Sequence, residues 1–182
     1  MPDEKDDKPG SLDRIRDDRG LARRSGFMAR RVRELAQKAR ELKLADEIEV
    51  VFPDKDLEAA VREELEKPEG PLTRGNLKRL ATLRCDSTGI EDLSGLEHAA
   101  NLTTLDLWGK WHTNGQISDV SPLASLTNLN ELNLDDNQIS DVSPLASLTN
   151  LTYLHLGGNP LSQESIDIHV PNLKSQGVDV DQ

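Results

Sequence analysis

The sequence predicts an α/β solenoid with a short curved parallel sheet and about four repeats, and three observations carry this prediction. The segment ISDVSPLASLTNL occurs twice without a change, at residues 117–129 and 139–151, which gives a period of 22 residues. The pattern LxxLxLxxN follows each copy. Only 3% of the 182 residues are aromatic while 35% are hydrophobic, so the core must be aliphatic. A fixed period of this kind indicates stacked units that share one continuous core.

The first ten residues, MPDEKDDKPG, are expected to form a disordered tail, and residues 11–45 a basic helical arm. Residues 11–43 hold 11 basic and 5 acidic side chains, a net charge of +6, whereas residues 44–182 carry −15. An apolar seam with a 4,3,4,3 spacing predicts an amphipathic helix that starts near Ser25 or Gly26. The seam consists of Met28, Val32, Leu35, Ala39 and Leu42.

The sequence leaves several roles open for this arm. Its seam can pack on the rest of the chain, or it can pair with another protein or with a second copy through residues 25–45. The basic face can bind an anionic membrane or nucleic acid, or occupy an acidic surface of the same chain. Nucleic acid is disfavoured because the −15 remainder repels phosphate and Phe27 is the arm's one aromatic residue.

Residues 46–79 are expected to form a helical cap ahead of the repeats. Leu57, Val61 and Leu65 recur at every fourth position, which predicts an apolar stripe that covers the first repeat. A second short helix is expected after Thr73. We place a C-terminal cap at residues 162–182, with a helix capped by Ser162, followed by Val178 and Val180, which close the edge of the last strand.

Residues 80–161 contain the repeats, whose first leucines stand at Leu80, Leu102, Leu129 and Leu151. Each xLxL core alternates with period two and predicts a short strand with its leucines pointing inward. The second unit carries five extra residues, within GKWHTNGQ at residues 109–116. Pro122 and Pro144 suit the start of a short helical turn on the return side. Cys85 replaces an inward leucine and is expected to be a buried, unreactive thiol. The polar Asn137 and Asn159 are expected to turn inward and satisfy backbone groups.

The region from about residue 50 to residue 182 resembles the 22-residue bacterial leucine-rich repeats of the internalin type, in repeat spacing, residue type and caps. The resemblance implies a leucine-rich repeat solenoid that binds a protein or peptide on its concave face, the face formed by the exposed strand residues. Carried over position by position, the expected binding residues are Arg84, Asp106, Trp108, Trp111, Glu131, Asn133, Asp135, Tyr153 and His155.

Two of the chain's three Trp and Tyr residues fall on this predicted face among carboxylates, which favours a basic partner. The competing interpretation is that the rings merely pad the sheet and the acids keep it soluble. The inserted loop with Trp111 can fold over the strands or be an inert excursion. A face of roughly 400 Å² is about half of what one partner buries in a stable interface, so it suits a weak ligand or a peptide.

The sequence offers no pattern for catalysis, and we expect no enzyme, metal or cofactor. The histidines lack ligand spacing, no glycine-rich phosphate loop is present, and one cysteine excludes an internal disulfide. No stretch approaches the roughly 20 apolar residues of a membrane helix. The N-terminus lacks the order of a secretory signal, which suggests the cytoplasm, although related repeat proteins are often exported. We therefore expect a protein-interaction module; the alternative is a structural or oligomerisation protein that acts through the basic helix.

Overall fold

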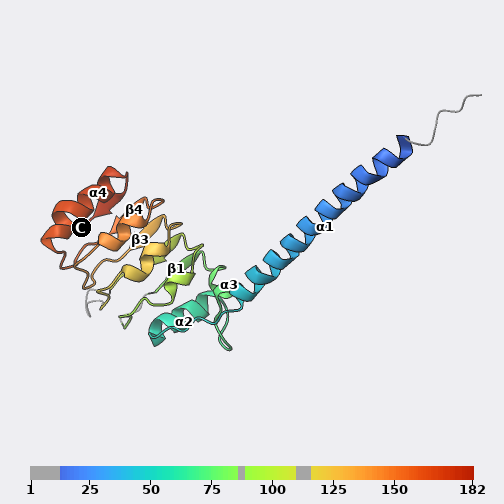
Figure 1. The fold of residues 1–182 in the computed structure, drawn as a ribbon. Coiled ribbons are helices and arrows are strands. Elements are labelled where there is room, and N and C mark those ends of the chain that lie inside the picture. The colour runs from blue at the N-terminus through green and yellow to red at the C-terminus, as the bar shows by residue number, and fades with distance from the viewer. Residues whose placement is uncertain (1–12, 86–88, 110–115) are drawn as a thin grey trace, which may run out of the picture. The chain divides into compact units, whose positions relative to one another are not determined.

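The computed structural model describes residues 13–85, 89–109 and 116–182, and the chain divides into two compact units, Met1–Leu44 and Ala45–Gln182. The first unit contains most of helix α1 (Asp13–Asp46), which is one continuous helix (Figure 1). The predicted start near Ser25 or Gly26 is wrong, because the helix runs through both residues. An isolated glycine costs a helix only about 1 kcal/mol relative to alanine, which a 34-residue helix tolerates.

The second unit is built on a parallel sheet whose strands follow the order of the chain. The strands are β1 (Thr82–Arg84), β2 (Thr104–Asp106), β3 (Glu131–Asn133), β4 (Tyr153–His155) and β5 (Asp179–Asp181). The predicted α/β solenoid is thus confirmed, with a fifth strand supplied by the C-terminal cap. Val180 pairs with Leu154 and continues the inward row of leucines.

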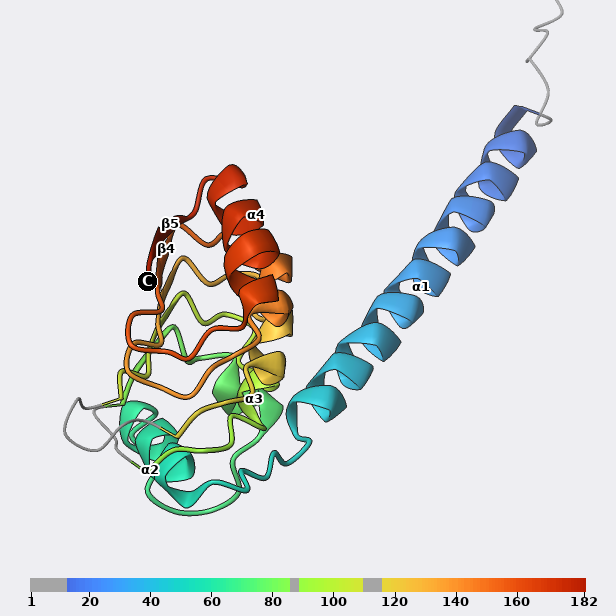
Figure 2. The same ribbon diagram turned by 90° about the vertical axis from the view of Figure 1, so that its left-hand side faces the viewer.

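Short helical turns lie on the opposite side of each unit from the strands (Figure 2). They are the 3-10 helices η1 (Leu96–His98), η2 (Ser121–Ser125) and η3 (Ser143–Ser147). Pro122 and Pro144 stand in the first turns of η2 and η3, where the missing N–H of proline has no helical acceptor in any case. The return-side prediction for these prolines is confirmed.

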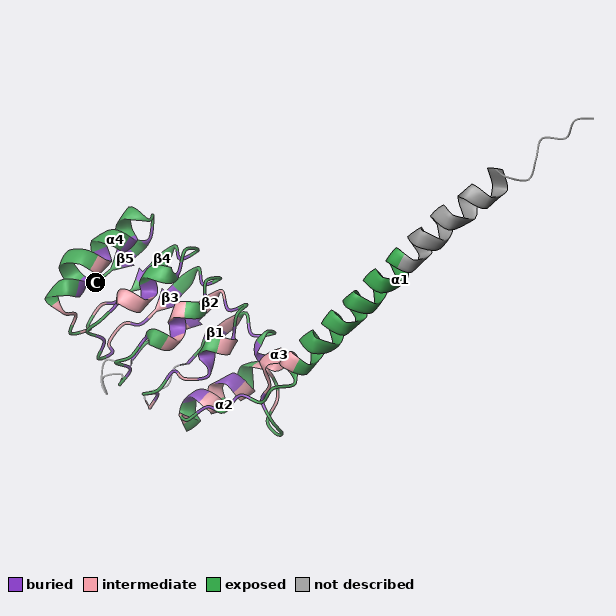
Figure 3. Ribbon diagram, viewed as in Figure 1, coloured by how far each residue is buried: buried purple, intermediate pink, exposed green. Residues whose placement is uncertain are grey.

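Buried residues recur from unit to unit along the strands and turns (Figure 3). Their side chains, almost all aliphatic, form one core between the two sides. Leu83, Leu105, Leu132 and Leu154, the central residues of the first four strands, are all at most 1% exposed. Cys85 is 5% exposed and belongs to the same core, as its position in the leucine pattern predicted. Phe52 is the one aromatic side chain among the described residues of this core.

Helices cover the N-terminal end of this stack. Helix α2 (Lys55–Glu64) buries Leu57 and Val61 completely, and Leu65 packs on the core in partly buried form. Helix α3 (Arg74–Leu77) begins after Thr73, as predicted. The Thr73 and Asn76 side chains form a reciprocal capping box there.

The C-terminal end is covered by a π-helical segment, η4 (Ser165–His169), followed by α4 (Val170–Ser175). Ser162 Oγ accepts the N–H of Ser165 at 3.1 Å, so the predicted capping role of Ser162 is confirmed. Pro171 accounts for the widened turn, because its ring would clash with the carbonyl four residues earlier in a regular α-helix.

Candidate functional site

The parallel register arranges the outward side chains of the strands in two rows across the concave face. The first row is Thr82, Thr104, Glu131, Tyr153 and Asp179, and the second is Arg84, Asp106, Asn133, His155 and Asp181. Because side chains alternate along a strand, the central residue between each pair points into the core. The sheet therefore holds ten side chains in fixed relative positions on its outer surface.

A third row lies just beyond the ends of the strands, where each unit begins to turn. Its described members include Trp108, Asp135 and Asp136. The indole Nε1 of Trp108 donates to Asp136 Oδ2 at 3.1 Å, which orients the ring. The N–H of Gly157 donates to Asp135 Oδ1 at 2.6 Å. The next residue, Gly158, has a positive φ of 72°, and a Cβ there would collide with the Asp136 carboxylate. Two adjacent carboxylates of one unit thus lie against two glycines of the next.

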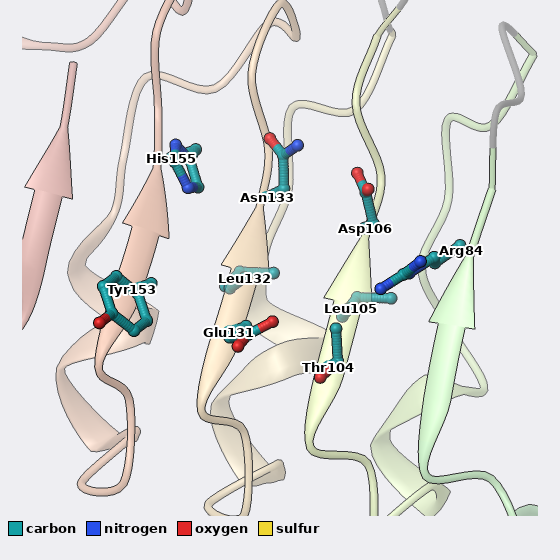
Figure 4. A pocket seen from close by; sticks show the side chains of 9 residues that line it. All are labelled: Arg84, Thr104, Leu105, Asp106, Glu131, Leu132, Asn133, Tyr153 and His155. Atoms are coloured by element: carbon teal, nitrogen blue, oxygen red, sulfur yellow. The ribbon is translucent and has the colours of Figure 1, made fainter.

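A shallow groove of about 230 Å³ crosses the first two rows over strands β1 to β4. Figure 4 shows Arg84 at one end of this groove and Tyr153 with His155 at the other, and Asp106, Glu131 and Asn133 lie between them. Tyr153 is 52% exposed and Trp108, in the third row, is 37% exposed. Both rings therefore present apolar surface to an incoming ligand, and the Tyr153 hydroxyl adds a polar group.

Carboxylates dominate the electrostatics of the three rows. The described acidic residues are Asp106, Glu131, Asp135, Asp136, Asp179 and Asp181, and Arg84 is the one Lys or Arg among the described residues of the rows. Burial raises the pKa of Asp135 above its ordinary value; the Gly157 N–H and His155 oppose this rise, while Asp181 and Asp136 add to it. His155 Nδ1 lies 3.9 Å from Asp181 Oδ2. The face attracts cations.

The structure brings most of the predicted binding residues together. Six line the groove: Arg84, Asp106, Glu131, Asn133, Tyr153 and His155. Trp108 and Asp135 lie in the third row, and Trp111 falls at residues 110–115, outside the described residues. The sequence prediction missed Asp179 and Asp181. Their alternation with Val178 and Val180 was the available signal, but the same alternation also fits a segment that only covers the sheet edge.

The described part of the chain contains no group of three His, Cys, Asp or Glu side chains placed to hold a metal ion. Within the same residues, no helix has both the length and the apolar character needed to cross a bilayer.

Comparison with known proteins agrees with this architecture. The family model for leucine-rich repeats in two copies matches residues 100–147 and 127–175. No curated protein matches the chain significantly. Among solved structures, an internalin (InlF) from Listeria monocytogenes is 31% identical over 72% of this chain and 36% of that one, with a TM-score of 0.63.

Two other solved structures are less alike in shape. An internalin C2 from Listeria monocytogenes is 29% identical over 72% of this chain and 74% of that chain, with a TM-score of 0.34. A two-domain structure of ZmpB from Clostridium perfringens is 36% identical over 50% of this chain and 18% of that chain, with a TM-score of 0.43. The match to this chain spans about a third of the length of the InlF structure.

The repeated strands, the aliphatic stack and the family match define the class: the chain is a leucine-rich repeat protein. Within that class it is internalin-like, with repeats of the bacterial internalin type.

Proposed function

We propose that this chain is a non-catalytic interaction module that binds a basic protein or peptide on its concave face. The observation that carries the proposal is the exposure of Tyr153 and Trp108 on one sheet face among six carboxylates. Aromatic side chains are the usual anchors of protein interfaces, and surrounding charge of one sign selects the opposite charge in a partner.

The dimensions of the face favour a short extended ligand. Five strands at about 4.8 Å spacing span roughly 20 Å, the length of about six extended residues. The strands are three residues long, so the face is narrow along the strand direction. A peptide laid across the strands would contact Arg84 at one end and Tyr153 near the other. A folded partner needs further surface for tight binding.

The test is fluorescence anisotropy with a labelled octapeptide of alternating lysine and serine, and an alternating glutamate and serine peptide as control. We expect binding of the lysine peptide only, weakened by added salt. Tyr153→Ala keeps the charge of the face and should reduce the affinity about fivefold or more. Glu131→Gln should also weaken binding, while Glu69→Gln, an equal charge change in the exposed loop after α2, should leave it nearly unchanged.

The proposal is wrong if Tyr153→Ala and Glu131→Gln bind as tightly as the parent chain. It also fails if the glutamate peptide binds equally well.

The alternative function, a structural or oligomerisation role through residues 25–45, makes the opposite prediction for this face. A Trp108→Ala, Tyr153→Ala double variant would lose its ligand under the first function and keep its partner under the second. The exposure of the arm's seam is the observation that favours such a role.

A further inference from the structure

We infer that helix α1 is a docking site for an acidic amphipathic helix of another protein. The seam predicted from the sequence lies on one continuous helix, and its larger side chains are exposed. The exposed fractions are 62% for Met28, 63% for Val32, 59% for Leu35 and 55% for Leu42. An apolar stripe of this exposure is stabilised when a partner removes it from water.

The spacing of the seam identifies a helix as the partner. With Val32 and Ala39 at position a and Met28, Leu35 and Leu42 at position d, the stripe follows the 3.5-residue period of a coiled coil. Val32 is branched at position a, and two of the three d positions are leucine, which suits a two-helix pairing. Helices that lie in a membrane surface have a broader apolar face, so this narrow stripe fits a second helix better than a lipid surface.

The charges beside the seam identify the kind of helix. Position g is occupied by Arg31 and Lys38, and position e by Lys43. The other two e positions are alanines, Ala29 and Ala36. The two acidic residues of this segment are at position c and have partners within the same helix. Glu34 pairs with Arg30 at 3.3 Å, and Glu41 accepts from Gln37 Nε2 at 3.1 Å.

These charges disfavour a second copy of the chain. In a parallel pair, Lys38 of one copy would face Lys43 of the other; in an antiparallel pair centred on Leu35, Arg31 would face Lys38. Neither arrangement produces an attractive e or g contact, and like charges at these positions select against pairing. A partner helix with aspartate or glutamate at e and g would instead form attractive contacts on both flanks.

The length of the seam bounds the strength of this interaction. At 1.5 Å per residue, the 15 residues from Met28 to Leu42 extend over roughly 21 Å, about two heptads. Coiled coils of this length are marginal, so the complex should depend on its charge pairs and weaken as salt screens them.

The experiment uses the full chain carrying Tyr153→Ala and Glu131→Gln, so that capture of a basic peptide by the concave face is weakened, and three labelled four-heptad peptides. One has isoleucine at a, leucine at d and glutamate at e and g; the second has lysine at e and g; the third is a scrambled form of the first. We expect the first to bind about tenfold or more tighter than the others by anisotropy. Leu35→Asp, which leaves the basic residues in place, should lose this binding.

A charge swap with a matched control tests the flanks. Arg31→Glu with Lys38→Glu should transfer the preference to the lysine peptide. Arg33→Glu with Arg40→Glu makes the same change in charge at position b, away from the seam, and should keep the preference for the glutamate peptide. Circular dichroism verifies that each variant retains the helix. Equal responses of the two pairs would overturn the proposal, because they would show attraction by net charge alone.

Two further results would contradict it. Sedimentation equilibrium of the chain alone is expected to show a monomer; a dimer that Leu35→Asp dissociates would mean that the seam serves a second copy. Vesicles of phosphatidylserine and phosphatidylcholine are expected to bind the chain no more than phosphatidylcholine vesicles do at physiological salt. Seam-dependent binding to the anionic vesicles, without binding of the glutamate peptide, would assign the arm to a membrane.

Discussion

At the residue scale, two inward asparagines hold the bends of the repeats. The amide nitrogen of Asn137 lies within hydrogen-bond distance of the carbonyls of Leu107, Leu134 and Asp135, at 2.9 to 3.1 Å, and the residue is 1% exposed. Asn159 repeats the arrangement one unit later and also accepts the N–H of Ile139 at 3.0 Å. Each amide therefore joins its own bend to the neighbouring unit.

Replacing Asn137 with alanine should destabilise the solenoid by about 2–4 kcal/mol, because buried carbonyls would lose their donor. Urea unfolding followed by circular dichroism measures the change. Asn150→Ala is the matched control, since its amide makes one exposed bond to the Thr127 carbonyl and its loss should cost about 1 kcal/mol or less. Equal losses for the two variants would contradict a structural role for the buried amide.

The sequence predicted the inward asparagines because a polar residue recurred in an apolar frame. It did not reveal a second series, in which the amides of Asn101, Asn128 and Asn150 donate to carbonyls of the preceding unit at 2.8 Å. These residues look like ordinary turn asparagines in one dimension. Their partners are 23 or 28 residues away, and only the stacking of the units brings the two together.

At the scale of elements, one carboxylate connects the N-terminal cap to the first repeat. Asp54 Oδ1 accepts the N–H groups of Asp56 and Leu57 at the start of α2, and Oδ2 accepts those of Glu91 and Asp92. Partial burial raises the pKa of Asp54, but these four donors outweigh it and the pKa lies below its ordinary value of 3.8. The folded state therefore favours the ionised form.

This shift makes the stability of the cap depend on pH. A lowered pKa in the folded state contributes stability above the ordinary carboxyl pKa, and the contribution is lost as the pH falls through the folded pKa. Asp54→Asn should reduce the free energy of unfolding by about 1–3 kcal/mol near neutral pH, and its deficit should shrink toward pH 3.

Urea titrations at a series of pH values measure this convergence. Glu63→Gln, at an exposed position of α2, controls for the loss of one negative charge from the helix. A deficit that stays constant between neutral and acid pH would show that the ionisation of Asp54 contributes nothing.

Element existence was easier to predict from the sequence than element extent. The xLxL cores located four strands, because two leucines separated by one residue share a face on a strand but not on a helix. The fifth strand was predicted only as Val178 and Val180 closing the edge of the sheet, because they follow a helix and not a repeat, and nothing local distinguishes a sheet strand from an edge cover. The start of α1 was misplaced because Gly20 and Gly26 were given more weight than the length of the helix around them.

At the scale of the whole molecule, opposite charges belong to different compact units. The +6 segment lies almost entirely within α1, and the −15 segment includes the whole of the unit Ala45–Gln182. The concave face could be assembled from the sequence because a repeat of known period places equivalent positions side by side. The arm has no such repeat. Helical spacing made its seam and flanking charges predictable from the sequence, but the exposure of the seam became known only from the structure.

Deleting residues 1–44 should leave the stability of the remaining chain unchanged within about 0.5 kcal/mol. The buried core extends from Val50 to Val180, and the described side chains of residues 27–44 are all exposed. Deleting these described residues therefore removes no part of the core.

The helical signal at 222 nm should fall, because α1 is lost. In the full chain that part of the signal should decline gradually on heating, since a single helix without a packed face unfolds with little cooperativity. Both tryptophans, Trp108 and Trp111, belong to the retained chain, so tryptophan fluorescence should give the same urea midpoint with and without the arm. A lower midpoint after deletion would show instead that the arm stabilises the solenoid, and Leu35→Asp in the full chain should then reproduce the loss.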